Sequence, residues 1–172
     1  MDRDALRALQ APLKEQYKTA PEQAQITLKA TGTLGEGVSC SVDTGRAIAN
    51  AGLHPATGGD GSLLCSGDML LEALVACAGV TLGAVSTSLN IPINEGKVHA
   101  EGDLDFRGTL GVEKTAPVGF SDIRLRFELD TDADDEQLAT LLKLTERYCV
   151  VLQTLTRGPE LDVKLERAAA AA

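Results

Sequence analysis

The sequence predicts an α+β fold, and three observations lead to that class. Several segments alternate apolar and polar residues as half-buried strands do, and most of them come in pairs joined by short turns. A long segment between two such pairs is apolar on nearly every side of a helix. The predicted order is hairpin, loop, buried helix, hairpin, helix and strand, which lacks the regular alternation of a doubly wound sheet.

Composition limits the classes of function. The chain has 172 residues, a formal net charge of −9, and only 3% aromatic residues with no Trp. Its Lys and Arg residues are scattered singly, so neither the basic stripe nor the stacking aromatics of a nucleic-acid binder are present. The longest apolar run, Ala73 to Leu82, is too short to span a membrane, and the amino end lacks the apolar core of a signal peptide. We therefore expect a cytoplasmic protein that binds neither nucleic acid nor membrane.

The amino-terminal third predicts a helix followed by a hairpin. Residues 1–20 have helical spacing and form a predicted extension, which Pro12 should break or kink. Gln23–Ala30 and Val38–Val42 alternate like strands and are joined by a Gly-containing turn. The polar, Gly-rich segment Asn50–Gly67 predicts a loop.

The central helix should begin at Ser66 or Asp68, either of which can cap a helix, and run to about Leu89. Its Leu, Val and Ala residues face almost every direction, so we expect protein on all its sides. A single domain of this size can hardly cover such a helix. The pattern therefore suggests a dimer in which two of these helices share a core.

Two long strands should follow, over Gly96–Phe106 and Val118–Leu129, joined as a hairpin. The acidic run Asp132–Glu136 suits the beginning of the next helix, where the helix dipole favours negative charge. That helix should reach Cys149, and a bent continuation to Leu155 fits the same apolar pattern.

The last predicted element is a closing strand over Pro159–Glu166, where Leu161, Val163 and Leu165 alternate with polar residues. The chain contains no internal repeat or low-complexity linker. We therefore expect one domain over residues 21–167, followed by a frayed alanine tail at 168–172.

Two cysteines carry the chemistry that the sequence suggests. Cys77 lies in the middle of the apolar helix and Cys149 near the end of the later helix, so they can meet only through the tertiary fold. In a reducing compartment a pair of thiols is more often a redox device than a structural staple. A thiolate can attack a peroxide and become a sulfenic acid, which a second thiol converts to a disulfide. The alternative is that Cys77 is a small apolar residue of a buried helix.

Other chemistry finds less support in the sequence. The chain has no Cys-x-x-Cys pair, and His54 and His99 have no ligand-like spacing to the cysteines, so neither a metal nor a cofactor is expected. A thiol hydrolase would need a general base beside Cys77, and neither histidine is fixed there. Cys40 alternates inward on a strand as a core residue would. Cys65, just before the central helix, is a conceivable alternative resolving thiol.

Two motifs resemble those of the OsmC/Ohr family, the osmotically inducible and organic hydroperoxide resistance proteins. Ser66–Cys77 (SGDMLLEALVAC) is similar to the family helix P-E-x-L-L-A-A-L-A-A-C, and Thr145–Val151 (TERYCVV) to A-x-x-x-C-P-(V/I). The resemblance covers roughly residues 24 to 166. It implies an intertwined α+β homodimer, with β-hairpins and a closing strand packed around a long buried helix and the active site at the subunit interface.

The same resemblance implies an activity and its partners. Members of the family reduce organic hydroperoxides with a pair of thiols, so Cys77 would be the peroxidatic thiol and Cys149 the resolving one. In the best-understood branch a lipoylated protein, acting as a dithiol, reduces the disulfide again. The amino-terminal 20 residues have no counterpart in this resemblance.

The chain departs from the family pattern at its acidic position. The family Glu, ten positions before the first cysteine, corresponds to Gly67 here. Asp68 lies one position away and could replace it only if the start of the helix shifts. Glu72, five positions before Cys77, should point away from the thiol on a helix of 3.6 residues per turn.

Two further departures concern an arginine and a proline. The family's catalytic Arg has no match in Thr31–Gly37, so Arg46 and Arg147 are the nearest candidates, each also consistent with a solvated surface residue. The usual Pro after the second cysteine is Val150 here. Without the family Arg and Glu, activation of the Cys77 thiol needs another source.

A second hypothesis is a dimer without enzymatic activity that binds an apolar small molecule between its subunits, its cysteines being structural. A pocket lined by Leu, Val and Ala with few polar groups would suit such a ligand. The two hypotheses differ in the reactivity of Cys77. A catalytic thiol should be alkylated fast near neutral pH, whereas a packed thiol should stay inert until the protein unfolds.

Overall fold

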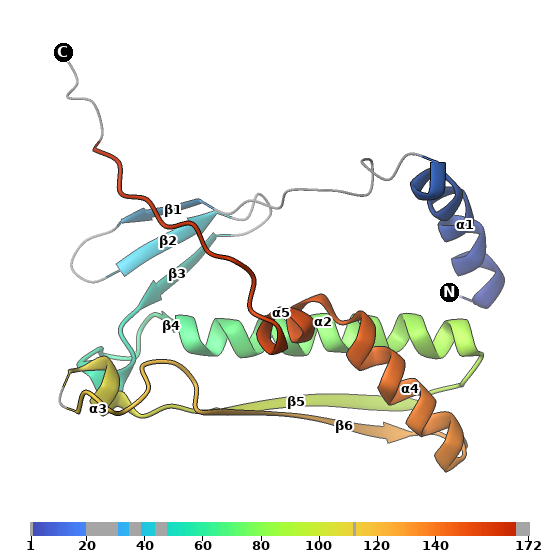
Figure 1. The fold of residues 1–172 in the computed structure, drawn as a ribbon. Coiled ribbons are helices and arrows are strands. Elements are labelled where there is room, and N and C mark those ends of the chain that lie inside the picture. Colours follow the sequence, from blue (N-terminus) through green and yellow to red (C-terminus); the bar gives the residue numbers. More distant parts are fainter. Residues whose placement is uncertain (1, 20–30, 35–38, 44–47, 112, 168–172) are drawn as a thin grey trace.

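The fold is arranged along one helix, α2, in a computed structural model that describes residues 2–19, 31–34, 39–43, 48–111 and 113–167 (Figure 1). The antiparallel pair β5–β6 runs beside α2, and α4 and α5 pack on the same helix. A four-stranded sheet, in the order β1-β2-β3-β4, leads into its first turn. This arrangement confirms the α+β class. The elements are α1 (Arg3–Thr19), β1 (Thr31–Leu34), β2 (Ser39–Asp43), β3 (Ile48–Gly52), the 3-10 helix η2 (Pro55–Thr57), β4 (Leu64–Cys65), α2 (Ser66–Leu89), β5 (Glu95–Asp103), α3 (Phe106–Thr109), β6 (Asp122–Asp130), α4 (Asp135–Tyr148) and α5 (Val150–Thr156).

The predicted central helix is confirmed, with a correction at its start. Cys65 occupies the N-cap position and makes no side-chain cap hydrogen bond, so neither Ser66 nor Asp68 caps the helix. At the other end Asn90 adopts a left-handed conformation with φ of 58°, and its N–H bonds to the last helical carbonyls. By length and hydropathy alone α2 could cross a membrane, criteria that the core helix of a soluble protein also meets.

Only one stripe of α2 is covered by the single chain. The buried positions recur every three or four residues, as one helix face does, and they are Leu74, Ala78, Leu82, Val85 and Ser86. On another side Val80 is 76% exposed. The expected enclosure on all sides is therefore not provided by one copy of the chain.

The predicted second hairpin is confirmed in its pairing and faces. β5 and β6 pair antiparallel from Glu95 opposite Asp130 to Asp103 opposite Asp122. Alternate residues of β6, Ile123 among them, are half-buried towards α2, and those between are exposed. The strand expected to reach Phe106 ends at Asp103, because the Asp105 carboxylate accepts a hydrogen bond from Arg107 N–H and begins α3.

The amino-terminal half differs more from expectation. The strand predicted over Gln23–Ala30 lies outside the described residues, while residues 31–34 form β1 and pair with β2. Within the predicted loop Asn50–Gly67, β3 and the two-residue β4 pair in parallel. These strands were missed because they are short and rich in small or polar residues. Pro12 does not break α1, which is continuous from Arg3 to Thr19.

The helix that leads to Cys149 follows the prediction closely. Asp134 caps α4 through a reciprocal pair of hydrogen bonds with Gln137, and acidic residues fill the first turn. α4 ends at Tyr148, Cys149 is extended with φ −72° and ψ 106°, and α5 begins at Val150. The expected bent continuation is thus present as a second short helix.

The closing strand expected over Pro159–Glu166 is wrong for the single chain. Residues 158–167 form no strand, and Leu161, Val163 and Leu165 are 82%, 89% and 101% exposed. A strand requires a partner to pair with, and none of the described strands pairs with this segment. The predicted alanine tail lies outside the described residues.

Candidate functional site

The fold brings Cys77 and Cys149 together although they lie 72 positions apart. Cys149 is fully buried, in a cluster with Leu74 and Ala78 of α2. Cys77 packs against this cluster and remains partly exposed. The meeting of the two thiols follows from α2 packing against both α4 and α5, whose junction is Cys149.

The break between α4 and α5 leaves backbone amides available at the thiols. The N–H of Cys149 still bonds to the Thr145 carbonyl at 3.0 Å, and the first bond of α5 runs from Gln153 N–H to the Cys149 carbonyl at 2.9 Å. The amides of Val150, Val151 and Leu152 therefore have no intrahelical acceptor, as at any helix start. These amides influence the pKa values of the two thiols, Val150 and Val151 that of Cys77, and Val151 and Leu152 that of Cys149.

The environment of Cys77 favours its thiolate. Partial burial is the largest influence and raises the pKa of Cys77, because it penalises the charged form. Burial is outweighed by four hydrogen-bonding groups: the Val151 N–H, the Cys149 thiol, the Val150 N–H and the Thr81 hydroxyl. The pKa of Cys77 therefore lies below the ordinary thiol value. A larger share of Cys77 is then thiolate, the nucleophilic form, near neutral pH.

Cys149 is affected in the opposite direction. Burial raises the pKa of Cys149 most, the Leu152 and Val151 amides lower it, and the neighbouring Cys77 raises it further, with a net rise. The buried thiol thus keeps its proton while its partner is ionised. The two neighbouring thiols therefore differ in how easily they ionise, Cys77 more easily than Cys149.

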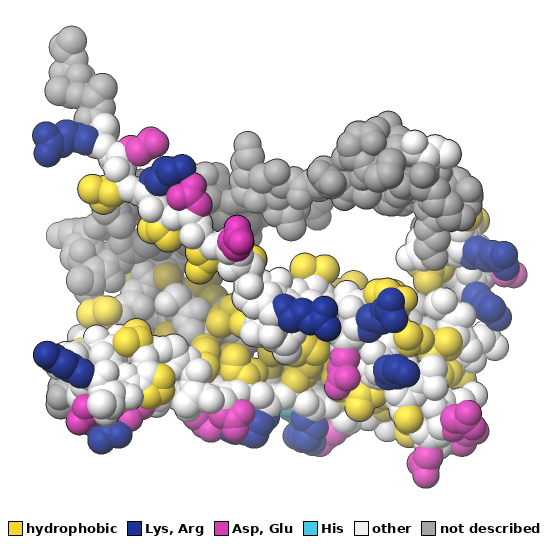
Figure 2. Space-filling model, in the orientation of Figure 1, with side chains coloured by type: hydrophobic (Ala, Val, Ile, Leu, Met, Phe, Trp, Pro, Cys, Tyr) yellow, Lys and Arg dark blue, Asp and Glu magenta, His cyan; other side chains and the backbone are white. Residues whose placement is uncertain are grey.

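Exposed valines lie close in sequence to both cysteines. Val80 lies three positions further on α2, on an adjacent helical position, and Val150 follows Cys149. Both side chains are largely exposed. Figure 2 shows hydrophobic side chains in the middle of the molecule, in the region of α2 and α5.

The predicted acidic supports lie elsewhere. Asp68 and Glu72 precede Cys77 by nine and five positions, which places them on other sides of α2. They line a separate pocket of about 390 Å³ with residues of α2 and β5. Neither is among the groups that influence Cys77 or Cys149.

The predicted arginines do not supply a positive charge to the thiol in the part of the chain that the structure describes. The guanidinium of Arg147 lies over the Tyr148 ring, 5.7 Å from its centroid. Arg46 lies outside the described residues. The sequence did not suggest the backbone amides near Cys149 as donors, because only a helix break leaves them without a helical acceptor. The one available signal for such an amide was Val150, which stands where the family motif has proline.

The remaining cysteines stand apart from the pair. Cys65 precedes Cys77 by twelve helical positions, a rise of about 18 Å, which excludes a disulfide between them within one chain. The alternative of Cys65 as resolving thiol within the chain is therefore wrong. Cys40 lies on β2, opposite Leu34 and Ala51 in the strand register.

The histidines have structural surroundings. His54 Nδ1 accepts a hydrogen bond from Ala56 N–H at 3.0 Å, and its ring stacks on Phe106 at 4.9 Å. His99 lies on the outer side of β5 with its Nε2 3.3 Å from Glu128. Neither histidine is among the groups that influence Cys77. The described residues also contain no cluster of three or more His, Cys, Asp or Glu that could hold a metal ion.

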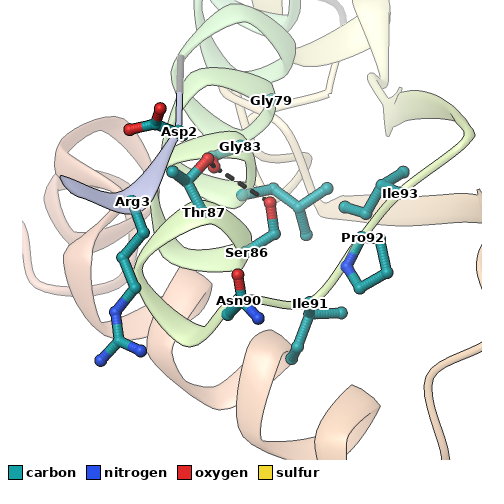
Figure 3. Close-up of a pocket in the computed structure, with 11 residues that line it drawn as sticks. Asp2, Arg3, Gly79, Gly83, Ser86, Thr87, Asn90, Ile91, Pro92 and Ile93 are labelled. Atoms are coloured by element: carbon teal, nitrogen blue, oxygen red, sulfur yellow. Dashed lines mark hydrogen bonds between the residues drawn. The ribbon is translucent and has the colours of Figure 1, made fainter. Parts of the chain in front are cut away.

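A larger pocket, of about 570 Å³, lies between the start of α1 and the end of α2 (Figure 3). Its lining mixes apolar side chains with Asp2, Arg3 and Asn90. The hydroxyls of Ser86 and Thr87 both donate to the Gly83 carbonyl within it. No cysteine lines it, and its charged and polar residues differ from the pocket with few polar groups that the ligand-binding hypothesis expects.

Comparisons with known proteins agree on one family. The model of the OsmC-like protein family matches residues 59–164. No curated protein matches the sequence. Among solved structures, the chain is similar to an OsmC-like protein from Mycoplasma pneumoniae at 18% identity, with a TM-score of 0.65 over 78% of this chain and 90% of that one.

Two further solved structures are organic hydroperoxide resistance proteins. The protein from Elizabethkingia anophelis matches at 20% identity with a TM-score of 0.60, over 78% of this chain and 90% of that chain. The protein OhrB from Bacillus subtilis matches at 23% identity with a TM-score of 0.51, over 77% and 92%. At identities this low, the structural similarity demonstrates a shared fold and no more.

Proposed function

This chain belongs to the OsmC-like protein family, and we propose that it is a thiol-dependent peroxidase that reduces organic hydroperoxides. The observation that carries the proposal is the contact between the Cys77 and Cys149 thiols, with Cys77 favoured as thiolate and Cys149 held as thiol. The relatives from Elizabethkingia anophelis and Bacillus subtilis, named for organic hydroperoxide resistance, support the same activity.

The cycle that we propose conserves atoms and electrons at each step. The Cys77 thiolate attacks one peroxide oxygen of ROOH, the O–O bond breaks, and the products are a Cys77 sulfenic acid and an alkoxide that takes a proton to become ROH. The Cys149 thiol then attacks the sulfenic sulfur, which forms a disulfide and releases water. A dithiol reductant, such as a lipoylated protein, exchanges with the disulfide and becomes oxidised in turn.

The preference for organic peroxides rests on the surroundings of the reactive sulfur. The exposed side chains of Val80 and Val150 lie close in sequence to Cys77 and Cys149, and an alkyl or aryl group that packed on them would bury apolar surface. Hydrogen peroxide would gain nothing from that contact. We propose an organic hydroperoxide as the substrate for this reason.

The proposal includes a homodimer with the site near the subunit interface. The exposed apolar side of α2 and the unpaired, alternating segment 158–167 are surfaces that a second copy could cover. Members of the family are generally soluble, and we propose a cytoplasmic location, with the catalytic domain over residues 21–167 and the amino-terminal 20 residues as an extension.

Intact-mass analysis after one equivalent of cumene hydroperoxide tests the cycle. The reduced wild type should lose about 2 Da as the disulfide forms, and Cys149→Ser should gain about 16 Da as a sulfenic acid. Cys77→Ser should not change. Cys65→Ser is the matched control, because it removes another partly exposed free thiol and should behave as the wild type does.

The opposite result favours the second hypothesis. If the wild type and all variants keep their masses for minutes, the peroxidase proposal is wrong, and an apolar ligand without chemistry at the thiols becomes the better explanation. If Cys65→Ser abolishes the mass loss, the assignment of the resolving thiol is wrong instead.

A further inference from the structure

We propose that the Thr81 hydroxyl supports the reactive side chain of Cys77. It bonds to the Cys77 carbonyl while that side chain is a thiol, and it turns to the sulfur when the thiolate forms. This inference rests on the proposed function and adds a residue to its site. The two family motifs that the chain resembles end at Cys77 and begin at Thr145, so neither includes Thr81.

The position of Thr81 on α2 places its hydroxyl beside Cys77. Thr81 follows Cys77 by four residues, so the two side chains are neighbours on one face of the helix. Helical side chains point back towards the preceding turn, which here contains the cysteine. The Thr81 Oγ1 donates a hydrogen bond to the Cys77 carbonyl oxygen at 2.7 Å, in a partly buried setting. The hydroxyl is therefore held at the residue that carries the thiol.

The bond to the carbonyl leaves the hydroxyl free to change its acceptor. Because α2 is continuous from Ser66 to Leu89, the Cys77 carbonyl also accepts the helical hydrogen bond from the Thr81 N–H. The carbonyl thus keeps a partner when the hydroxyl turns away. Rotation of the hydroxyl re-aims its proton and moves no heavier atom. Since a charged acceptor forms the stronger hydrogen bond, ionisation of Cys77 draws this proton towards the sulfur.

The electrostatics of Cys77 agree with this geometry, and a second threonine separates the proposed role from an ordinary one. Burial raises the pKa of Cys77, and the Thr81 hydroxyl is among the hydrogen-bonding groups that lower it. Threonines within helices often bond to the carbonyl four residues earlier. Thr87 does so in α2, with its Oγ1 2.8 Å from the Gly83 carbonyl oxygen. Gly83 has no side chain to ionise, so Thr87 makes the same bond without the proposed role.

The test measures alkylation of Cys77 by iodoacetamide in the reduced full-length chain, resolved by peptide mass spectrometry, across about pH 5 to pH 10. Thr81→Val keeps the β-branched shape and removes the hydroxyl. The midpoint of its profile should lie about 0.7 of a pH unit above that of the wild type, with slower alkylation at neutral pH. Thr81→Ser, which keeps the hydroxyl, should stay close to the wild type. Thr87→Val is the matched control and should follow the wild type.

Thr81→Ala also lacks the hydroxyl and suits a helix, so its midpoint should equal that of Thr81→Val whatever the packing of the valine. An unchanged midpoint in both variants, the same rise in Thr81→Ser, or an equal rise in Thr87→Val would each overturn the proposal. Slower alkylation at every pH with no change of midpoint would also overturn it, because that result indicates a structural role alone.

These measurements use no peroxide, so they can fail independently of the proposed function. A wild type that is inert to cumene hydroperoxide, together with a raised midpoint in Thr81→Val, would reject the peroxidase and retain the role of Thr81. A wild type that forms the disulfide, together with an unchanged midpoint in Thr81→Val and Thr81→Ala, would retain the peroxidase and reject that role.

Discussion

At the scale of residues, the two thiols differ because their neighbours differ. Both are penalised by burial, but Cys77 receives the Val150 and Val151 amides and the Cys149 thiol, while Cys149 has an ionised neighbour. The pKa values move apart in consequence, one down and one up. A pair of identical side chains thereby acquires two roles.

Removal of Cys149 should affect the first step as well as the second. Its thiol stabilises the Cys77 thiolate, so Cys149→Ala should raise the pKa of Cys77 and slow sulfenic acid formation several-fold near neutral pH. Cys149→Ser, which keeps a hydroxyl donor, should recover part of the rate. Single-turnover trapping of the sulfenic acid with dimedone measures both. Identical rates in the two variants would limit Cys149 to resolving the sulfenic acid.

The sequence predicted the two cysteines of the pair better than the groups that influence their ionisation. Cys77 and Cys149 were identified from their helices, whereas Asp68 and Glu72 lie at a separate pocket. Side-chain candidates can be chosen from sequence because chemistry belongs to residue types. The amides without a helical acceptor at the start of α5 arise from a break in backbone hydrogen bonding, which residue types do not encode.

At the scale of elements, α4 positions Cys149, and its start is fixed by a cap. Asp134→Ala removes the reciprocal bonds with Gln137 and should lower the free energy of unfolding by about 1 kcal/mol. Asp134→Asn retains a capping oxygen and should lose less than Asp134→Ala does. Urea unfolding of the reduced protein measures the difference. Equal losses in the two variants would mean that the cap contributes through charge alone.

Elements were predictable where one face is buried over many residues. β6 alternates over nine positions, and α4 carries acidic residues at its start and an apolar stripe, so both were recognised. β4 has two residues and pairs in parallel with β3, an arrangement that depends on tertiary contacts rather than on a local pattern. The closing strand had the right pattern and no partner within the chain.

At the scale of the whole molecule, the single chain leaves apolar surface that a monomer rarely exposes. If the segment 158–167 pairs with a second copy, replacing Leu161, Val163 and Leu165 together by Ser should lower the mass in solution from twice the 18.0 kDa chain mass to the monomer value. Light scattering after size exclusion measures this. Replacing Glu160, Asp162 and Lys164 by Ser is the control on the other face, and dissociation of that variant alone would contradict the predicted face.

The helix break at Cys149 has a consequence for how readily the proposed disulfide is reduced. Donors that favour a thiolate stabilise the reduced protein, whereas a disulfide carries no negative charge for them to hold. Any couple whose reduced form is stabilised has a higher reduction potential. The amides at the start of α5 would therefore make the Cys77–Cys149 couple more oxidising. Its disulfide would then accept electrons readily from a dithiol donor after every turnover.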